Sequence, residues 1–443
     1  MARYLLAASP IPGHVTPMIA VAADLRRRGH EIALLTGAAF RPAVVRAGVR
    51  PLLLPAAAHP RPITPRRGPL PDVVRRWRTG RAELLSGFLA PLTSQYAALA
   101  TASKRDRYDA VLVDVMYTGA IPFLLSERPR PPVLACGVVP LMLSSADTPP
   151  FGIGWRPRAG RDYTTMNRFV HDVLFRADQA RLDAALRELA VARAPVFFLD
   201  WPVLADRILQ FTVPGFEYPR RDLPSSVVFT GPVPPPADTE PASPDRWDVL
   251  DRGRTVVLVT QGTWDNADLG QLIRPTLSAL GGRDDLVVVA TTGGSSAPIG
   301  PVPANAMVLD YVPYSRLLPH VDVMITNGGY GGVQQALGHG IPVIVAGDTA
   351  DKPEIAARAA HFGAGIDLGT ARPRPDRIAA AVDRLLSADA YRAGARRLAA
   401  DMANHTPFET IAQVLASLPR PPRARPSAGH GHRVRSIRER RRR

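Results

Sequence analysis

The chain alternates between short, continuous apolar runs and longer segments with helical spacing. Residues 3–9 (RYLLAAS), 31–37, 108–115 and 132–140 are apolar over most of their length. Such runs, rich in Val and Leu, are typical of parallel strands that helices cover on both faces. Residues 18–30 repeat their apolar positions at helical spacing between the first two runs. This order of strand, turn, helix and strand predicts the start of a doubly wound α/β sheet.

The same pattern begins again after residue 250. We predict helices at 269–280 and 352–365, and strands in the runs 254–263 (closing on a glycine turn), 286–293, 306–313, 321–326 and 340–347. Between the two halves lies a segment rich in Pro, Ser and Asp, which indicates an interdomain linker. The sequence therefore predicts two Rossmann-like domains that face each other across a cleft, divided as 1–232, linker 233–250, 251–400, a C-terminal helix at 401–418 and a tail at 419–443.

Length and cysteine content narrow the class of protein. A chain of 443 residues is longer than one core usually serves, which agrees with two domains. The one cysteine, Cys136, excludes a disulfide framework and a cysteine-based zinc site, and it suits a reducing cytoplasm. No apolar stretch is long enough to span a bilayer. The first apolar run is short and ends in Pro-Gly-His, so a signal peptide is the weaker interpretation.

The net charge of +16 is concentrated at the C-terminus. Residues 420–443 hold ten arginines and one glutamate, so they carry +9 and leave +7 for the rest of the chain. This tail has almost no apolar residues to bury, which predicts disorder. Two alternatives stay open: a tail without a role, or loose binding that makes the protein peripheral to anionic lipid. No stacking aromatics lie between the arginines, so we expect no specific nucleic-acid partner.

The segment TNGGYGGVQQALGHGIP (326–342) has the strand, glycine turn and helix order of a phosphate site. Its first six positions after Thr326 include Gly328, Gly329, Gly331 and Gly332. Asn327 and the backbone amides near Gly331, Gly332 and Val333 are expected to bind a diphosphate without a lysine. Four glycines exceed what a tight turn needs for packing alone.

The turn after the first strand of the second half, Gly262 and Thr263, is expected to face the same site. The chain contains no Asp-x-Asp sequence, so a metal ion that bridges the diphosphate has no obvious ligands. We therefore predict neither a metal nor a cofactor.

Seven motifs together resemble a known family. They are GHVTP (13–17), LVDVM (112–116), FTGPVP (229–234), VTQGT (259–263), YVPYSRLLP (311–319), TNGGYGGVQQAL (326–337) and GDTADKPEIAARAAHFGAG (347–365). In this order and spacing they resemble the GT-B nucleotide-sugar-dependent glycosyltransferases, the family of bacterial macrolide, flavonoid and glycolipid glycosyltransferases (glycosyltransferase family 1). The resemblance covers residues 1–415, and it implies an enzyme with a nucleotide-sugar donor and a small acceptor.

The resemblance also implies roles for single residues. His14 would be the general base and Asp114 its carboxylate partner. Tyr311 and Val312 lie in the aromatic-x-Pro segment that holds the nucleotide base, and the glycine turn would hold the diphosphate. The pair Asp351 and Lys352 would contact the sugar hydroxyls.

The chemistry of inverting glycosyl transfer suits the first pair. An imidazole can accept the acceptor proton because its pKa lies near neutrality. A carboxylate on the other ring nitrogen fixes the tautomer and stabilises the imidazolium. His14 and Asp114 meet this need if their strands are neighbours. The alternatives are that His14 is a turn residue and that Asp114 is a helix cap.

Three positions depart from the family pattern and bear on the donor. Asn327 replaces a histidine, Gln335 replaces a glutamate that binds the ribose, and Lys352 replaces a glutamine. An amide at position 335 is a weaker acceptor than a carboxylate and suits a 2′-deoxyribose. This favours a dTDP-deoxysugar such as rhamnose over UDP-glucose. Lys352 is either a compact cation for sugar or phosphate oxygens or a helix-start ion-pair residue.

The acceptor is expected on the first domain, in the loops around 56–80 and 140–170. Trp77, Trp155 and Met142 are candidates to line an apolar site there, and each is an equal candidate for ordinary core. We predict transfer of a hexose to a hydroxyl of an apolar natural product or glycolipid. An epimerase or hydrolase with this fold, or a binding protein without catalysis, is the alternative. Retention of both His14 and Asp114 argues against loss of catalysis.

Overall fold

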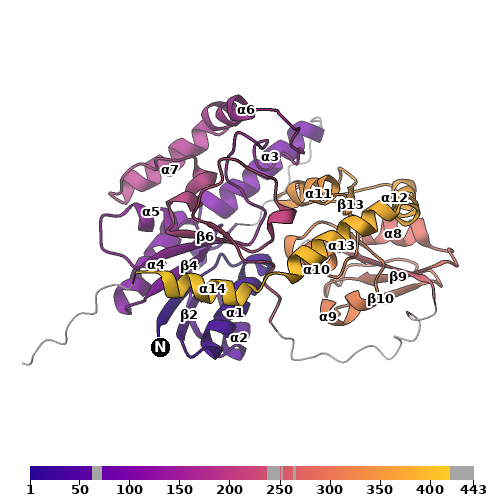
Figure 1. The fold of residues 1–443 in the computed structure, drawn as a ribbon, viewed down its shortest axis with the longest axis horizontal. Helices are drawn as coiled ribbons and strands as arrows, with labels where there is room; N and C mark the ends of the chain where they lie inside the picture. Colours follow the sequence, from indigo (N-terminus) through magenta and orange to yellow (C-terminus); the bar gives the residue numbers. More distant parts are fainter. Residues whose placement is uncertain (62–71, 237–249, 251–252, 263–265, 420–443) are drawn as a thin grey trace, which may run out of the picture.

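The computed structural model describes residues 1–61, 72–236, 250, 253–262 and 266–419, which form two parallel sheets flanked by helices (Figure 1). Thr263, most of the predicted linker and the arginine-rich tail lie outside the described residues. The first part contains β1 (Arg3–Ala7), α1 (Pro12–Arg27), β2 (Glu31–Thr36), α2 (Arg41–Arg46), β3 (Arg50–Leu53), α3 (Asp72–Leu84), α4 (Leu92–Arg105), β4 (Ala110–Asp114), α5 (Ala120–Leu125), β5 (Val133–Gly137), α6 (Thr164–Phe169), α7 (Arg176–Glu188), β6 (Arg207–Gln210) and β7 (Val227–Phe229).

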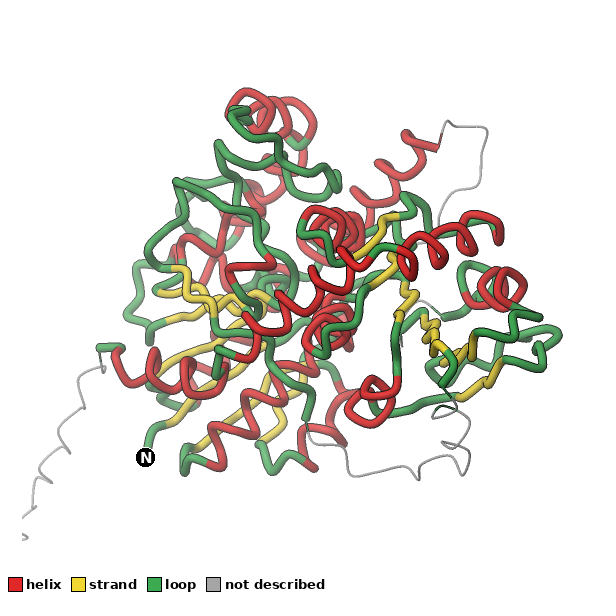
Figure 2. Tube along the Cα trace, turned by 45° about the vertical axis from the view of Figure 1, so that its right-hand side comes forward, coloured by secondary structure: helices red, strands yellow, loops and turns green. Residues whose placement is uncertain are grey.

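The second part contains β8 (Thr255–Thr260), α8 (Ile273–Leu280), β9 (Leu286–Thr291), β10 (Ala306–Leu309), α9 (Tyr314–Leu317), β11 (Val323–Thr326), α10 (Tyr330–Gly338), β12 (Val343–Val345), α11 (Lys352–His361), β13 (Gly365–Asp367), α12 (Pro375–Ser387), α13 (Asp389–Ala403) and α14 (Pro407–Ser417). Figure 2 shows the strands of both halves enclosed between helices.

Both sheets have the doubly wound strand order. The first runs β3-β2-β1-β4-β5-β6-β7 and the second β10-β9-β8-β11-β12-β13, with parallel pairing throughout. The order reverses between β1 and β4 in the first sheet and between β8 and β11 in the second. In such sheets, ligands bind at the carboxyl ends of the strands at this reversal. The predicted pair of Rossmann-like domains is confirmed.

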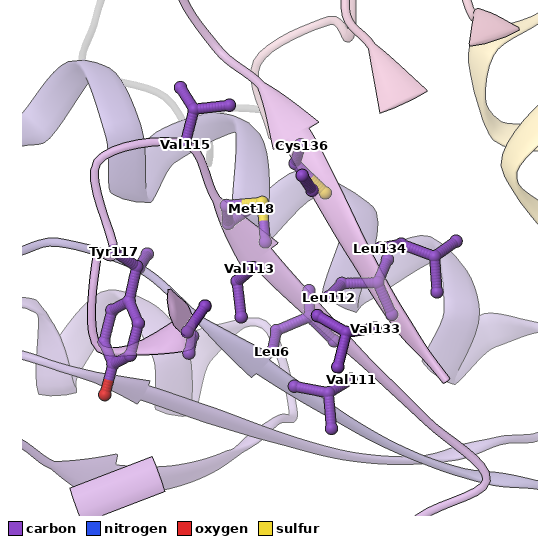
Figure 3. Close-up of a cluster of buried hydrophobic side chains, with 14 of the residues drawn as sticks. Leu6, Met18, Val111, Leu112, Val113, Val115, Tyr117, Val133, Leu134 and Cys136 are labelled. Atoms are coloured by element: carbon purple, nitrogen blue, oxygen red, sulfur yellow. The ribbon is translucent and has the colours of Figure 1, made fainter. Parts of the chain in front are cut away.

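Continuous burial explains why the strand sequences are apolar on both faces. All five residues of β4 and of β5 are buried. Figure 3 shows this packing around Leu6, Val113 and Leu134, with Cys136 in the same cluster. In the second sheet, successive residues of β8 face two separate cores: Val256 and Leu258 on one side, Val257 and Val259 on the other.

Three helices begin elsewhere than predicted. The C-terminal helix α14 starts at Pro407 rather than at 401, because residues 401–403 end α13. Helix α1 starts at Pro12 rather than at residue 18, because proline at the first helical position lacks only an N–H that the helix does not use. His14 therefore lies in the first turn of a helix. Helix α8 starts at Ile273 rather than at 269. The side-chain oxygen of Gln261 accepts the N–H groups of Leu272 and Ile273, both at 3.1 Å, and so fixes this start.

The two halves exchange segments. Val213 and Phe216, which follow β6, are buried in a core of the second sheet. The Phe216 ring stacks on the Tyr330 ring there, with 6.4 Å between the ring centroids. In return, α14 places Ile411 and Leu415 in the first core and lies beside α1 (Figure 1). No helix in the described part of the chain is both long and apolar enough to cross a membrane.

Candidate active site

His14 and Asp114 meet at the reversal point of the first sheet. Asp114 is the last residue of β4, and His14 lies in the first turn of α1, directly after the neighbouring strand β1. The His14 Nδ1 atom lies 2.8 Å from the Asp114 Oδ1 atom. The aspartate is fully buried and the histidine side chain is 12% exposed. The predicted contact between these two residues is therefore present.

Backbone groups fix the orientation of the Asp114 carboxylate. Its Oδ2 accepts the N–H of Ser9 at 2.5 Å, and its Oδ1 accepts the N–H of Met116 at 2.7 Å. The second bond closes an Asx turn. The helix-cap alternative for Asp114 does not hold, because the next helix, α5, begins at Ala120 with Gly119 at its N-cap position and no side-chain cap. Because a carboxylate only accepts, Nδ1 of His14 carries the proton and Nε2 is left as the basic nitrogen. This arrangement can remove a proton from a hydroxyl group.

The glycine turn before α10 leaves space and backbone donors at the reversal point of the second sheet. Gly328 has a φ of +94°, and an added Cβ would lie 2.8 Å from Val345. At Gly329 and Gly331 an added Cβ would meet no atom within 4 Å. Gly329 precedes the first helical residue, Tyr330, and no described side chain caps this helix. Packing therefore requires glycine at 328 but not at 329 or 331.

The amides available to an anion are shifted by one residue from the predicted set. The N–H of Val333 donates to the Gly329 carbonyl at 3.0 Å, and its side chain is buried in the core. The first-turn amides from Tyr330 to Gly332 are the ones that a helix of this kind offers to a ligand. An added Cβ at Gly332 would lie 3.4 Å from the Tyr314 ring, so this glycine lies against the core.

Asn327 and Gly262 close the same edge of the second sheet. The Asn327 Nδ2 donates to the Gln261 carbonyl at 2.7 Å and so links the ends of β8 and β11. A primary amide has two N–H groups, so Asn327 can still donate one to a ligand. Gly262 has a φ of +70°, and its N–H donates to the Thr260 hydroxyl at 3.1 Å.

The expected contacts for the nucleoside lie on both sides of this turn. Tyr311 is 52% exposed, whereas the Val312 side chain is buried in the core, so Val312 can contact a ligand only through its backbone. Gln335 is partly exposed on α10, and its Nε2 donates to the Gly331 carbonyl one turn earlier, at 3.3 Å.

The pair Asp351 and Lys352 lies at the start of α11, after a backbone turn in which Ala350 has a φ of +53°. This left-handed conformation is uncommon for a residue with a side chain. Burial raises the pKa of the Asp351 carboxyl, while the charges of Lys352 and His14 act in the opposite direction. His14 therefore lies within electrostatic range of Asp351, which brings the predicted base of the first domain near the predicted sugar-binding pair of the second.

Some contributors were missed by sequence reasoning. Ser9 holds Asp114 through its backbone, which no side-chain pattern reveals. Asn266 donates to the carbonyls of Gly262, Thr292 and Gly293 at 3.4, 3.0 and 3.1 Å and so joins the loops after β8 and β9. The one available signal was an asparagine in a loop that follows a strand.

The acceptor-site candidates divide by exposure. Trp77 and Trp155 are exposed on the first domain, and Met142 is buried in its core. Among the described residues, no group of three His, Cys, Asp or Glu side chains is placed to hold a metal ion.

Two doubly wound domains, each with polar groups at its reversal point, have the architecture of the GT-B fold. The family description "Erythromycin biosynthesis protein CIII-like, C-terminal domain" matches residues 274–418. The chain is 38% identical over 409 residues to 4'-demethylrebeccamycin synthase of Lentzea aerocolonigenes, which covers 90% of this chain and 94% of that protein. It is 33% identical over 416 residues to UDP-glycosyltransferase 2 of Phaeomoniella chlamydospora, and this alignment covers 89% of this chain and 91% of that protein.

Among solved structures, the glycotransferase of kitacinnamycin aligns with a TM-score of 0.70 at 20% identity, covering 94% of this chain and 98% of that one. This likeness agrees with the fold. The chain therefore belongs to the natural-product glycosyltransferases of glycosyltransferase family 1, and it is an enzyme that uses nucleotide-sugar donors. The resemblance drawn from the seven sequence motifs is confirmed.

Proposed function

We propose that this enzyme transfers a sugar with inversion of the anomeric carbon and that His14 is its general base. The observation that carries the proposal is the 2.8 Å contact between His14 and the fully buried Asp114. In this step Nε2 takes the proton of the acceptor hydroxyl while the oxygen attacks the anomeric carbon. The bond to the nucleoside diphosphate breaks on the opposite face, and Asp114 stabilises the imidazolium that forms.

The leaving diphosphate binds at the start of α10. The helix dipole and the amides of its first turn favour negative charge there, and the open positions at Gly329 and Gly331 leave room for phosphate oxygens. Asp351 and Lys352 contact the sugar. These assignments place the leaving group on the second domain and the base on the first.

The donor is a dTDP-deoxysugar, such as dTDP-rhamnose, and the acceptor is a hydroxyl of an apolar natural product or glycolipid. Gln335 supports the nucleotide, because a neutral amide gains less from a ribose 2′-hydroxyl than a glutamate would. Exposed Trp77 and Trp155 support an apolar acceptor. Five relatives carry UDP in their names, so the choice of nucleotide is tested directly.

Calorimetry with dTDP, dUDP and UDP separates the contributions to nucleotide choice, because dUDP and UDP differ only in the 2′-hydroxyl. The wild type is expected to bind dUDP and dTDP more tightly than UDP. Gln335→Glu is expected to shift the preference towards UDP by about tenfold, the size of one charge-assisted hydrogen bond. Gln413→Glu, an exposed position on α14, gives the same change in net charge at a distance from the turn.

Equal affinity of the wild type for dUDP and UDP would remove the dTDP assignment. The product decides the reaction class. Transfer yields a glycoside with inverted configuration, whereas an epimerase or hydrolase needs no acceptor and yields an isomerised donor or free sugar.

A further inference from the structure

A buried ion network joins the two domains beside the predicted sugar-binding pair. Arg358 of α11 is 1% exposed. Its Nε and one terminal nitrogen lie 2.9 and 2.8 Å from Oε2 of Glu217, which directly follows Phe216. Its other terminal nitrogen lies 2.8 Å from Oε2 of Glu354, one turn earlier on the same helix. One guanidinium thus pairs with a carboxylate from each side of the domain junction.

Both carboxylates also accept hydrogen bonds from the backbone of the loop that follows β5. Oε1 of Glu217 accepts the N–H of Leu141 at 2.8 Å. Oε1 of Glu354 accepts the N–H groups of Gly152 and Gly154, each at 2.9 Å. The network therefore holds residues 141–154 at both ends, and this segment falls within the loops expected to bind the acceptor. We name residues 141–154 the acceptor loop.

The acceptor loop lies directly against the first turn of α11. Gly154 has a φ of +66°, and a Cβ there would lie 2.7 Å from the side chain of Pro353 and 2.9 Å from its carbonyl oxygen. Pro353 directly follows Lys352, so the contact is one residue away from the predicted sugar-binding pair. A movement of the acceptor loop away from α11 would break this contact.

The backbone N–H groups of the acceptor loop help to stabilise the buried charges of this network. Glu217 and Glu354 pair with Arg358, the buried Arg220 guanidinium adds a second positive charge near both carboxylates, and the two glycine N–H groups satisfy the remaining oxygen of Glu354. Burial disfavours the charged guanidinium, but Glu217 and Glu354 outweigh burial and raise the pKa of Arg358. The ring of Tyr218 also faces this guanidinium, at 4.4 Å. A buried charge that loses its partners is costly. Moving the acceptor loop away from α11 would leave the buried Glu354 carboxylate without its two N–H partners, so the loop and the start of α11 are expected to move as one unit.

We propose that Glu354 is a positioning residue that couples the acceptor loop to the donor sugar, so that occupation of the donor site orders the loop. This inference rests on the proposed function, in which Asp351 and Lys352 contact the sugar. A donor that fixes the first turn of α11 also fixes the carboxylate of Glu354. That carboxylate in turn holds Gly152 and Gly154, so a bound donor reduces the mobility of this end of the acceptor loop.

Hydrogen–deuterium exchange on the full chain tests the coupling, with dTDP-glucose and UDP-glucose as probes at saturating concentration. In the wild type, we expect exchange at least about tenfold slower both in the glycine turn (327–337) and in the acceptor loop. In Glu354→Gln, protection of the glycine turn stays and protection of the acceptor loop is lost. Glu409→Gln, which breaks an exposed pair with Arg28, should behave as wild type.

A second variant tests the same link from the other side. Gly152→Ala strains a position with a φ of +97° that has no neighbour within 4 Å of the added Cβ, and it leaves the ion pairs of α11 intact. It too should lose protection of the acceptor loop, and thermal unfolding of both variants checks that they fold.

The outcomes are distinguishable. If neither probe protects the glycine turn of the wild type, the proposed donor site is wrong. If the turn is protected but the acceptor loop is not, or if both variants keep loop protection, the coupling is overturned while the donor site stands.

Discussion

Replacing Asp114 by asparagine should remove the carboxylate that pairs with His14 while the side chain keeps almost the same size and shape. The carboxylate accepts three donors: Ser9 N–H on Oδ2, and Met116 N–H and His14 Nδ1 on Oδ1. An asparagine has one oxygen and one NH₂ group. With the NH₂ group at the Oδ2 position it faces the Ser9 N–H, and at the Oδ1 position it faces Met116 and His14. Either orientation sets a donor against a donor in a fully buried site.

The expected size follows from these contacts. One buried N–H without a partner lowers the free energy of unfolding by about 1–3 kcal/mol. Loss of the carboxylate also removes the group that holds Nε2 of His14 as the base and stabilises its imidazolium. Turnover should therefore fall by roughly two to four orders of magnitude, the range of a general-base contribution.

Steady-state turnover, nucleotide calorimetry and chemical unfolding of Asp114→Asn measure these effects separately. Asp24→Asn is the matched control, because Asp24 is a buried aspartate of the same domain that pairs with Arg27 and Arg28. The control should lose stability and keep turnover in the folded fraction. If Asp114→Asn loses stability but keeps turnover, the carboxylate only supports the fold, and the reasoning is refuted.

Three further substitutions separate effects on binding or turnover from effects on stability. Gly329→Val should weaken nucleotide binding by tenfold or more, roughly 1.4 kcal/mol, with little change in unfolding, because its Cβ points into open space; Gly328→Val should destabilise the fold through its φ of +94°. Asp351→Asn should lower turnover yet stabilise the fold at pH 7, since burial raises the pKa of Asp351. Its stabilisation should vanish below about pH 4, where the carboxyl is protonated in both folded and unfolded chains; calorimetric melting across pH checks the sign.

The predicted parts of the fold are those with a local signal. The strands were recognisable because burial on both faces demands continuous apolar residues, and the contact of His14 with Asp114 followed once β1 and β4 were neighbours. The start of α1 was misplaced because prolines and a glycine resemble a turn although Pro12 suits a first helical position. The sequence does not show that the amide of Val333 is used within the helix, because its partner, the Gly329 carbonyl, depends on the exact start of α10.

The domain junction had no local signal at all. Glu217 and Arg358 are separated by 141 positions, and each is an ordinary charged residue in its own segment. Only the folded chain shows that they pair in a buried site and that Glu354 carries the contact on to the acceptor loop. Long-range pairs of this kind form when the two domains meet, so neither periodicity nor motif spacing indicates them.

Turnover of His14→Ala tests whether His14 takes the acceptor proton. Release of the nucleoside diphosphate is measured with the donor and acceptor that support wild-type transfer, and nucleotide affinity is measured by calorimetry on the same preparation. Turnover should be lower by roughly two to four orders of magnitude with an unchanged nucleotide Kd, because the base and the diphosphate site lie on different domains. Turnover equal to that of the wild type would show that His14 is not the base.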